Sequence, residues 1–167
     1  KLPVILYNVP SRTGVNILPA TYKKLSEIDN IAAVKEASGN YQQITDIGAL
    51  CGDDLTVYSG NDEQAADILA LGGKGVISVL GNILPEAVHD ICISYLKGDA
   101  KKSEDLQLKY LPLMKALFLD VNPIPVKQAM RVMGYDAGPC RLPLCDMEQD
   151  TAEKMYEVMA GYGLIER

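Results

Sequence analysis

Short apolar runs alternate with amphipathic segments through the first part of the chain. The apolar runs are rich in β-branched residues and lie at 3–8, 31–37, 55–60 and 75–80. Helical periodicity follows the first three runs, at about 19–28, 41–51 and 62–72. Nearly continuous apolar strands that alternate with helices are typical of a parallel sheet covered on both faces. The pattern therefore predicts an α/β fold.

Beyond residue 82 the pattern changes to helices alone. The predicted helices lie at 83–98, 101–119, 122–134 and 147–163. No low-complexity segment or long linker interrupts the chain. The helical part is therefore expected to follow the sheet directly.

Four βα units fit either an open doubly wound sheet or the second half, strands 5 to 8, of a TIM (β/α)8 barrel. Reactive groups in barrels collect at the carboxyl ends of the strands. Polar residues end every predicted strand here: Tyr7-Asn8, Lys35-Glu36, Ser59-Gly60-Asn61-Asp62, then Ser78 and Gly81-Asn82. No GxGxxG loop follows the first strand, which disfavours a dinucleotide fold. We therefore predict a half-barrel at 1–82, followed by the last barrel helix and a C-terminal helical region at 83–167.

Composition limits the classes of function. The 167 residues carry a formal net charge of −6, which argues against binding to nucleic acid. The apolar fraction of 48% is that of an ordinary globular protein, and no apolar run approaches the roughly 20 residues of a membrane span. The chain starts close to a predicted strand with no initiator Met and no leader, so we expect it to be part of a longer protein.

The four cysteines, at 51, 92, 140 and 145, form no CxxC pair. Cys140 and Cys145 lie close together, but no second pair and no nearby histidine completes a zinc site. We therefore expect no metal site, and free thiols that are buried or half-buried.

Lys35 directly follows the apolar run 31–34, which reads as a buried strand. Lysine is seldom buried in proteins without a partner, so its position needs an explanation. One interpretation is a side chain that extends from the strand end to water. The other is a Schiff-base nucleophile, because desolvation disfavours the ammonium and leaves an amine that can attack a carbonyl. Glu36 alternates to the opposite face of the strand, so it need not pair with that amine.

Tyr7 ends the neighbouring predicted strand. It is either a ring at the edge of the core or, if the strands are parallel, a phenol that relays protons beside the Lys35 amine. Arg12 lies in a loop restricted by Pro10 and Gly14. It is either a solvated side chain or a fork for a substrate carboxylate.

Polar residues also open the third predicted helix. Asn61 is expected to cap that helix with its side chain. Asp62 and Asp67 are interpreted as charges near the helix start, where the helix dipole favours them.

Five segments together carry a resemblance to a known family: LYNVPSRTG, AVKEASG, YSGND, GGKGVISVLGN and NPIPVKQAM. They resemble the second half of the dihydrodipicolinate synthase family, which belongs to the pyruvate-dependent class I aldolase superfamily with N-acetylneuraminate lyase. The resemblance covers essentially the whole chain. The Tyr–Lys pair is shared across the superfamily, whereas the SRTG segment is more selective for the synthase family.

The resemblance implies a lyase of lysine and diaminopimelate biosynthesis that condenses pyruvate with aspartate semialdehyde to give hydroxytetrahydrodipicolinate. It implies that Lys35 forms the Schiff base, that Tyr7 relays protons, and that Arg12 holds the carboxylate of the semialdehyde. Gly60 and Ile77 would lie against bound pyruvate. The covalent imine would take the place of a cofactor, and no metal is implied. The implied enzyme is cytoplasmic and usually a homotetramer.

The first four βα units of that family have no counterpart in this chain. The strands at 4–7 and 75–80 would then be unpaired edges, which favour association. We therefore expect the chain alone to be inactive, and to self-associate or to require the amino-terminal half. The alternatives are another pyruvate-dependent aldolase, of the keto-sugar-acid or N-acetylneuraminate lyase type, and a non-catalytic half-barrel scaffold.

Overall fold

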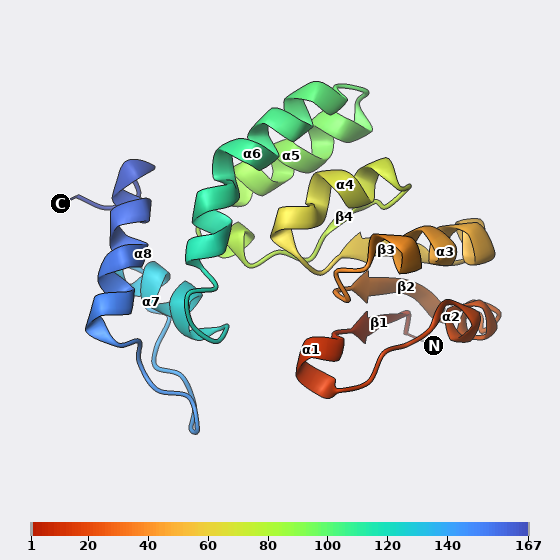
Figure 1. The fold of residues 1–167 in the computed structure, drawn as a ribbon, viewed down its shortest axis with the longest axis horizontal. Helices are drawn as coiled ribbons and strands as arrows, with labels where there is room; N and C mark the ends of the chain where they lie inside the picture. The colour runs from red at the N-terminus through yellow and green to blue at the C-terminus, as the bar shows by residue number, and fades with distance from the viewer. Residues whose placement is uncertain (1, 167) are drawn as a thin grey trace.

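A parallel sheet with its connecting helices forms the first part of the molecule, and helices alone form the second (Figure 1). The computed structural model describes residues 2–166. Its strands are β1 (Val4–Asn8), β2 (Ile31–Glu36), β3 (Thr56–Ser59) and β4 (Gly75–Val76). They lie side by side in the order β1-β2-β3-β4, each parallel to the next. This order follows the chain without reversal, as in a β/α barrel and unlike a doubly wound sheet.

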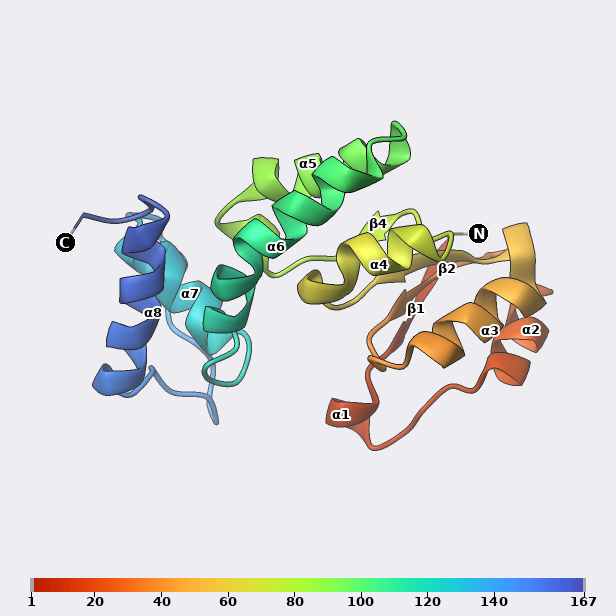
Figure 2. The ribbon, with the colours of Figure 1, turned by 45° about the horizontal axis from the view of Figure 1, so that its top comes forward.

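Helices connect the strands and then continue alone. The sheet region contains α1 (Pro10–Thr13), α2 (Pro19–Ser26), α3 (Tyr41–Cys51) and α4 (Ala65–Ala70), with 3-10 turns η1 (Gly52–Asp54), η2 (Asp62–Gln64) and η3 (Leu80–Asn82). The helical region contains α5 (Pro85–Leu96), α6 (Ala100–Ala116), α7 (Ile124–Val132) and α8 (Gln149–Gly161). Helices α5 and α6 run side by side, and α8 packs beside α7 (Figures 1 and 2).

One face of the sheet is packed against helices. Val34 of β2 and Val57 of β3 lie in a core with Tyr22 of α2, and with Ile44 and Ile47 of α3. Successive side chains of a strand point to opposite faces, so Val34 and Val57 mark one face of the sheet. The helices cover this face because the apolar side of each helix must also be buried. The α/β fold predicted from the pattern is confirmed.

The other face of the sheet is open at β1. Ile5 and Tyr7 are 53% and 49% exposed. The expectation that the sheet is covered on both faces is therefore wrong for this strand. The physical reason is that the four strands do not close on themselves, so no strand lies across from β1 within residues 2–166. Strands β1 and β4 each have one neighbour, and both edges of the sheet are unpaired there.

The helical region shares a second core with the end of the sheet region. Leu80 packs with Ile91 of α5, Leu113 of α6, and Met155 of α8. Ala65 of α4 belongs to the same core. The division at residues 82 and 83 stays a prediction, and its outermost positions, Lys1 and Arg167, lie outside the described residues.

Strand β4 is much shorter than the predicted strand at 75–80. The chain leaves the sheet after Val76, and the backbone N–H groups of Val79 and Leu80 donate to Oδ2 of Asp62, each at 2.9 Å. These bonds hold the segment in a turn, because groups that bond to a side chain cannot also extend a ladder. The predicted helix at 62–72 is likewise divided into η2 and α4.

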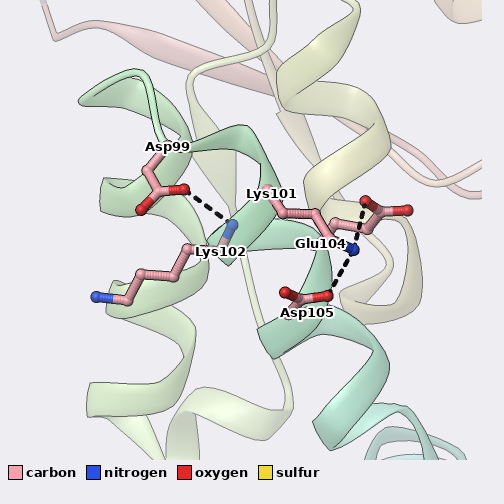
Figure 3. Close-up of polar contacts among 5 residues, drawn as sticks. All are labelled: Asp99, Lys101, Lys102, Glu104 and Asp105. Carbon is pink, nitrogen blue, oxygen red and sulfur yellow. Dashed lines mark hydrogen bonds and ion pairs between the residues drawn. The ribbon is translucent and has the colours of Figure 1, made fainter.

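The start of α6 shows why a helix forms where the pattern predicts one. Oδ1 of Asp99 accepts the backbone N–H of Lys102 at 3.0 Å, an N-cap that stabilises a helix by about 1 kcal/mol (Figure 3). Lys101 Nζ forms ion pairs with Asp105 at 2.8 Å and with Glu104 at 3.5 Å, on the exposed side of the same turn.

The four cysteines are free, and their exposure differs. Cys51 is buried, Cys92 and Cys140 are half-buried, and Cys145 is exposed. Burial raises the pKa of the Cys51 and Cys92 thiols. The expectation of buried or half-buried thiols is wrong for Cys145, because the loop before α8 carries it on the surface.

Within residues 2–166, no group of three or more His, Cys, Asp or Glu side chains is placed to hold a metal ion. No helix among these residues has the length and apolar character of a membrane span.

Candidate active site at the strand ends

Tyr7 and Lys35 lie side by side at the carboxyl ends of adjacent strands. They are direct partners in the register of β1 and β2. The Lys35 Nζ lies over the Tyr7 ring, 4.3 Å from the ring centroid. Both side chains belong to the open face of the sheet, since residues of the opposite parity are packed against the helices. The structure thus brings together the two residues that the sequence singled out as nucleophile and proton relay.

A cavity of about 840 Å³ adjoins this pair. Its lining on the sheet side includes Tyr7, Arg12, Lys35, Gly60 and Asp62. Its lining on the helical side includes Met114, Lys115, Phe118, Asp120 and Asn122, from the end of α6 and the turn before α7. The cavity is therefore built by segments far apart in the chain, and sequence reasoning missed all of its helical side.

Arg12 lies on one helical turn, α1, where an irregular loop was expected. Pro10 opens this turn, and Gly14 closes it at φ 70°, a conformation that glycine adopts without strain. Arg12 Nη1 donates to the backbone oxygen of Asn122 at 3.5 Å, the upper limit for such a bond. The guanidinium thus borders the cavity and faces the turn between α6 and α7.

Gly60 and Ile77 lie at the ends of β3 and β4. Gly60 lines the cavity, and a Cβ there would lie 2.6 Å from the Cβ of Ala37, so any larger residue would displace the backbone. Ile77 donates its N–H to Ser59 O at 2.9 Å, and its side chain is 38% exposed. Ile77 does not line the cavity of residues 2–166, whereas Gly60 does.

Behind the lysine, Glu36 is completely buried on the packed face of the sheet. Its Oε1 accepts from Asn8 Nδ2 at 3.0 Å and from Ser38 N at 2.8 Å. Its Oε2 accepts from the Tyr22 hydroxyl at 3.0 Å. The carboxylate therefore ties together the ends of β1 and β2, which carry Tyr7 and Lys35. The alternation of side chains along the strand predicted that Glu36 points away from the Lys35 amine, and this is confirmed. The hydrogen-bond network around Glu36 was not predicted.

The network extends from Glu36 into the neighbouring loop and helix. Asn8 Nδ2 donates to Asn16 Oδ1 at 2.8 Å, and Asn16 Nδ2 donates to Gln43 Oε1 at 2.8 Å. Burial and the adjacent Glu36 carboxylate raise the pKa of Tyr22, so its hydroxyl stays a donor. A signal was present in the sequence: Asn8 and Glu36 each directly follow a candidate site residue at a strand end.

Asp62 is a buried cavity residue and not a charge on the start of a solvated helix. Its side chain is 4% exposed, and its Oδ2 accepts the two backbone N–H groups of Val79 and Leu80. Asp62 does lie in the first turn of η2, and Asp67 in the first turn of α4, as the sequence predicted. What the sequence did not predict is that the Asp62 carboxylate is buried and bonds to η3. Asn61 makes no capping bond either, and its Nδ2 donates to Gln64 Oε1 at 2.8 Å.

Comparison with known proteins relates the whole chain to one family. The sequence profile of the dihydrodipicolinate synthetase family matches residues 1–160. The chain is similar to the 4-hydroxy-tetrahydrodipicolinate synthases of Caldicellulosiruptor saccharolyticus, 53% identical over 163 residues, and Clostridium perfringens, 52% identical over 164 residues. Each alignment covers 98% of this chain but only 55% or 56% of the relative, so the chain spans little more than half the length of these relatives.

A solved structure agrees with this relation. The dihydrodipicolinate synthase of Thermotoga maritima is 40% identical and superposes with a TM-score of 0.94, over 98% of this chain and 57% of that chain. The sheet of residues 2–166 and its helices match the C-terminal half of the TIM barrel of such structures, followed by their C-terminal helices.

Proposed function

The chain belongs to the dihydrodipicolinate synthetase family, and from this premise we propose that it carries the nucleophile of a lyase that condenses pyruvate with aspartate semialdehyde. The product would be hydroxytetrahydrodipicolinate, in the cytoplasmic biosynthesis of diaminopimelate and lysine. The observation that supports the proposal most directly is the Lys35 amine, 4.3 Å from the centroid of the Tyr7 ring on the border of the cavity.

The first step is imine formation on Lys35. The amine attacks the keto carbon of pyruvate, the carbonyl oxygen leaves as water, and a Schiff base forms. Loss of a proton from the pyruvate methyl group converts the imine to an enamine, because the protonated imine withdraws electrons. The proposed reaction needs no further cofactor, since the imine itself serves as the electron sink.

Tyr7 relays the protons of this step. The Lys35 amine lies over the Tyr7 ring, 4.3 Å from its centroid, and both residues line the same cavity, so a bound pyruvate would contact the two side chains together. Tyr7 donates its own proton to the oxygen that leaves as water and takes up the proton that the attacking amine loses, so the phenol ends as it began. Gly60 leaves room for pyruvate against the backbone, and Ile77 is proposed as a second pyruvate contact.

Arg12 binds the second substrate. The guanidinium of Arg12 can hold the semialdehyde carboxylate by two parallel hydrogen bonds, which places the aldehyde carbon for attack by the enamine. The amino group of the aldol product then displaces Lys35 from the imine as the ring closes, which frees the lysine for the next turnover.

The open face of β1 supports a further part of the proposal. The Lys35 amine is only half-buried, and Ile5 and Tyr7 on the same face are about half exposed. An open face does not exclude water from the reacting groups. The chain alone is therefore expected to be inactive, and activity to require the part of the relatives that this chain does not span, or association with further copies.

Borohydride trapping tests the proposal. We define the completed barrel as residues 1–167 joined behind the amino-terminal part of the Clostridium perfringens relative that this chain does not span. With pyruvate and borohydride, mass spectrometry of the completed barrel should show one reduced pyruvate adduct, on Lys35, and the chain alone should show little or none. No adduct in a folded completed barrel, or an adduct on another lysine, would contradict the proposal. It would favour a non-catalytic scaffold.

Arg12→Ala should weaken the use of aspartate semialdehyde without affecting imine formation with pyruvate. We expect KM for aspartate semialdehyde in the completed barrel to rise about tenfold or more, because a bidentate charged contact is lost. The rate of pyruvate trapping should change less than twofold. Arg141→Ala, at an exposed position outside this cavity, is the matched control. Equal losses in trapping and in turnover would show that Arg12 does not bind the second substrate, and would favour another pyruvate-dependent aldolase.

A further inference from the structure

A second cavity lies in the helical region of the molecule. Its volume is about 510 Å³, and it is formed by the start of α7 and the loop between α7 and α8. Its lining residues are Pro123, Lys127, Pro139, Cys140, Arg141 and Leu144. We call it the thiol cavity. None of these residues lines the cavity beside Lys35, so the two cavities are separate.

The charge of the thiol cavity is positive. Lys127 and Arg141 are its charged lining residues, and no Asp or Glu of the described chain lines it. Neither cation forms an ion pair within residues 2–166, although the net charge of the whole chain is −6. Asp146 of the same loop pairs instead with Arg131 of α7, at 2.6 Å. Pro123 is the N-cap of α7, so the cavity also borders the positive end of that helix dipole.

Cys140 adds a reactive group to this cavity. It is a free cysteine and half-buried. Cys145 of the same loop is also free and is more exposed, but it does not line the cavity. The chain turns between the two cysteines, where the Leu144 N–H donates to the backbone oxygen of Arg141 at 3.1 Å. One loop thus carries a thiol inside a cationic cavity and a second, more accessible thiol outside it.

The two cations fit acidic groups of a small molecule. The Arg141 guanidinium is a planar fork that matches a carboxylate, and Lys127 adds a compact charge from α7. The remaining lining, Pro123, Pro139 and Leu144, is apolar and can cover the rest of such a molecule. The same two cations repel a cationic reagent.

We propose that Cys140 is a modification site for small disulfides that carry acidic groups, which Lys127 and Arg141 hold while the sulfur atoms react. The Cys140 thiol loses its proton, and its sulfur attacks one sulfur of the bound disulfide. The S–S bond of the reagent breaks and a new S–S bond forms to Cys140, while the other half leaves as a thiol after taking up a proton. Cys140 is oxidised and the departing half is reduced, so no further oxidant is needed. This inference does not rest on the proposed function.

The test exposes the 167-residue chain to disulfides of different charge. Glutathione disulfide is anionic, bis(2-hydroxyethyl) disulfide is neutral, and cystamine is cationic. Peptide mapping by mass spectrometry gives the initial rates at Cys140 and Cys145, and the readout is the ratio of these rates. We expect the ratio for glutathione disulfide to exceed the ratio for cystamine about tenfold or more, because a charged site concentrates ions of opposite sign. The neutral disulfide should give an intermediate ratio.

Substitutions of Lys127 test the cavity itself, since this residue lies on α7 and not in the loop. Lys127→Gln should lower the ratio for glutathione disulfide about twofold or more and leave the ratio for the neutral disulfide unchanged. Lys127→Arg keeps the charge and should keep the preference. Lys97→Gln removes a charge from an exposed position outside the cavity and is the matched control, with no expected change. Circular dichroism verifies that each variant is folded.

Equal ratios for the three disulfides in the unsubstituted chain would overturn the inference, because the cavity would then select no charge. Failure of Cys140 to react with glutathione disulfide would overturn it as well. An equal effect of Lys97→Gln and Lys127→Gln would assign the preference to net charge. The preference should disappear in urea that unfolds the chain, because unfolding separates Lys127 from Cys140. A preference that survives unfolding would come from the adjacent Arg141 alone and would contradict a role of the cavity.

Discussion

Lys35→Ala in the completed barrel should lower kcat about a thousandfold or more and abolish pyruvate trapping. The primary amine is the only group proposed to form a covalent bond with pyruvate, and loss of a covalent nucleophile leaves only binding and positioning to accelerate the reaction. The variant should fold normally, because Lys35 is half-buried on the open face and makes no packed contact in either hydrophobic core.

Two controls make this result specific. Lys74→Ala removes an exposed lysine that precedes β4, at the end of the sheet opposite the cavity, and should leave turnover unchanged. Lys35→Arg keeps a positive charge but has no nucleophilic amine, so it should be as inactive as the alanine variant. Substantial turnover by Lys35→Arg would show that charge at this position suffices, and the Schiff-base role would have to be abandoned.

Glu36→Ala should lower the free energy of unfolding by about 3 kcal/mol or more. The substitution leaves the Asn8 amide, the Tyr22 hydroxyl and the Ser38 N–H without their acceptor in a buried place, and each unpaired donor is costly. Urea unfolding followed by circular dichroism measures the loss. Glu27→Ala, at an exposed position on the same sheet region, should change the unfolding free energy little.

A double-mutant cycle separates the network from simple loss of volume. In Glu36→Ala combined with Tyr22→Phe, the phenol no longer needs an acceptor, so part of the loss should be recovered. Strict additivity of the two substitutions would contradict the proposed coupling. Slower pyruvate trapping in Glu36→Ala is also expected, since the ends of β1 and β2 would lose the bond that joins them behind Tyr7 and Lys35.

Much of the fold could be predicted because it depends on local pattern. Helix α3 begins and ends at the predicted residues, and the strands up to β3 differ by one or two residues. Strand β4 could not be predicted at its true length. The run at 75–80 has strand composition throughout, but a carboxylate more than a dozen residues earlier captures two of its N–H groups.

The candidate site could likewise be predicted only in part. Tyr7 and Lys35 could be placed together because the carboxyl ends of neighbouring parallel strands meet at one edge. Glu36 and Asp62 lie in the segments AVKEASG and YSGND, yet their burial could not be predicted because it depends on helices packed over them. The approach of Asn122 to Arg12, 110 residues away in the chain, left no trace in either local pattern.

The sequence by itself determined the βα repeat, the parallel order of the strands and the pairing of a lysine with a tyrosine at the strand ends. These follow from residue periodicity and strand geometry, which act over a few residues. Only the tertiary structure decided that Asp62 is buried with a free oxygen, that Glu36 anchors two strands, and that one face of β1 is open. Burial and hydrogen bonding of a polar side chain depend on which distant segment packs against it, and that is a property of the folded chain.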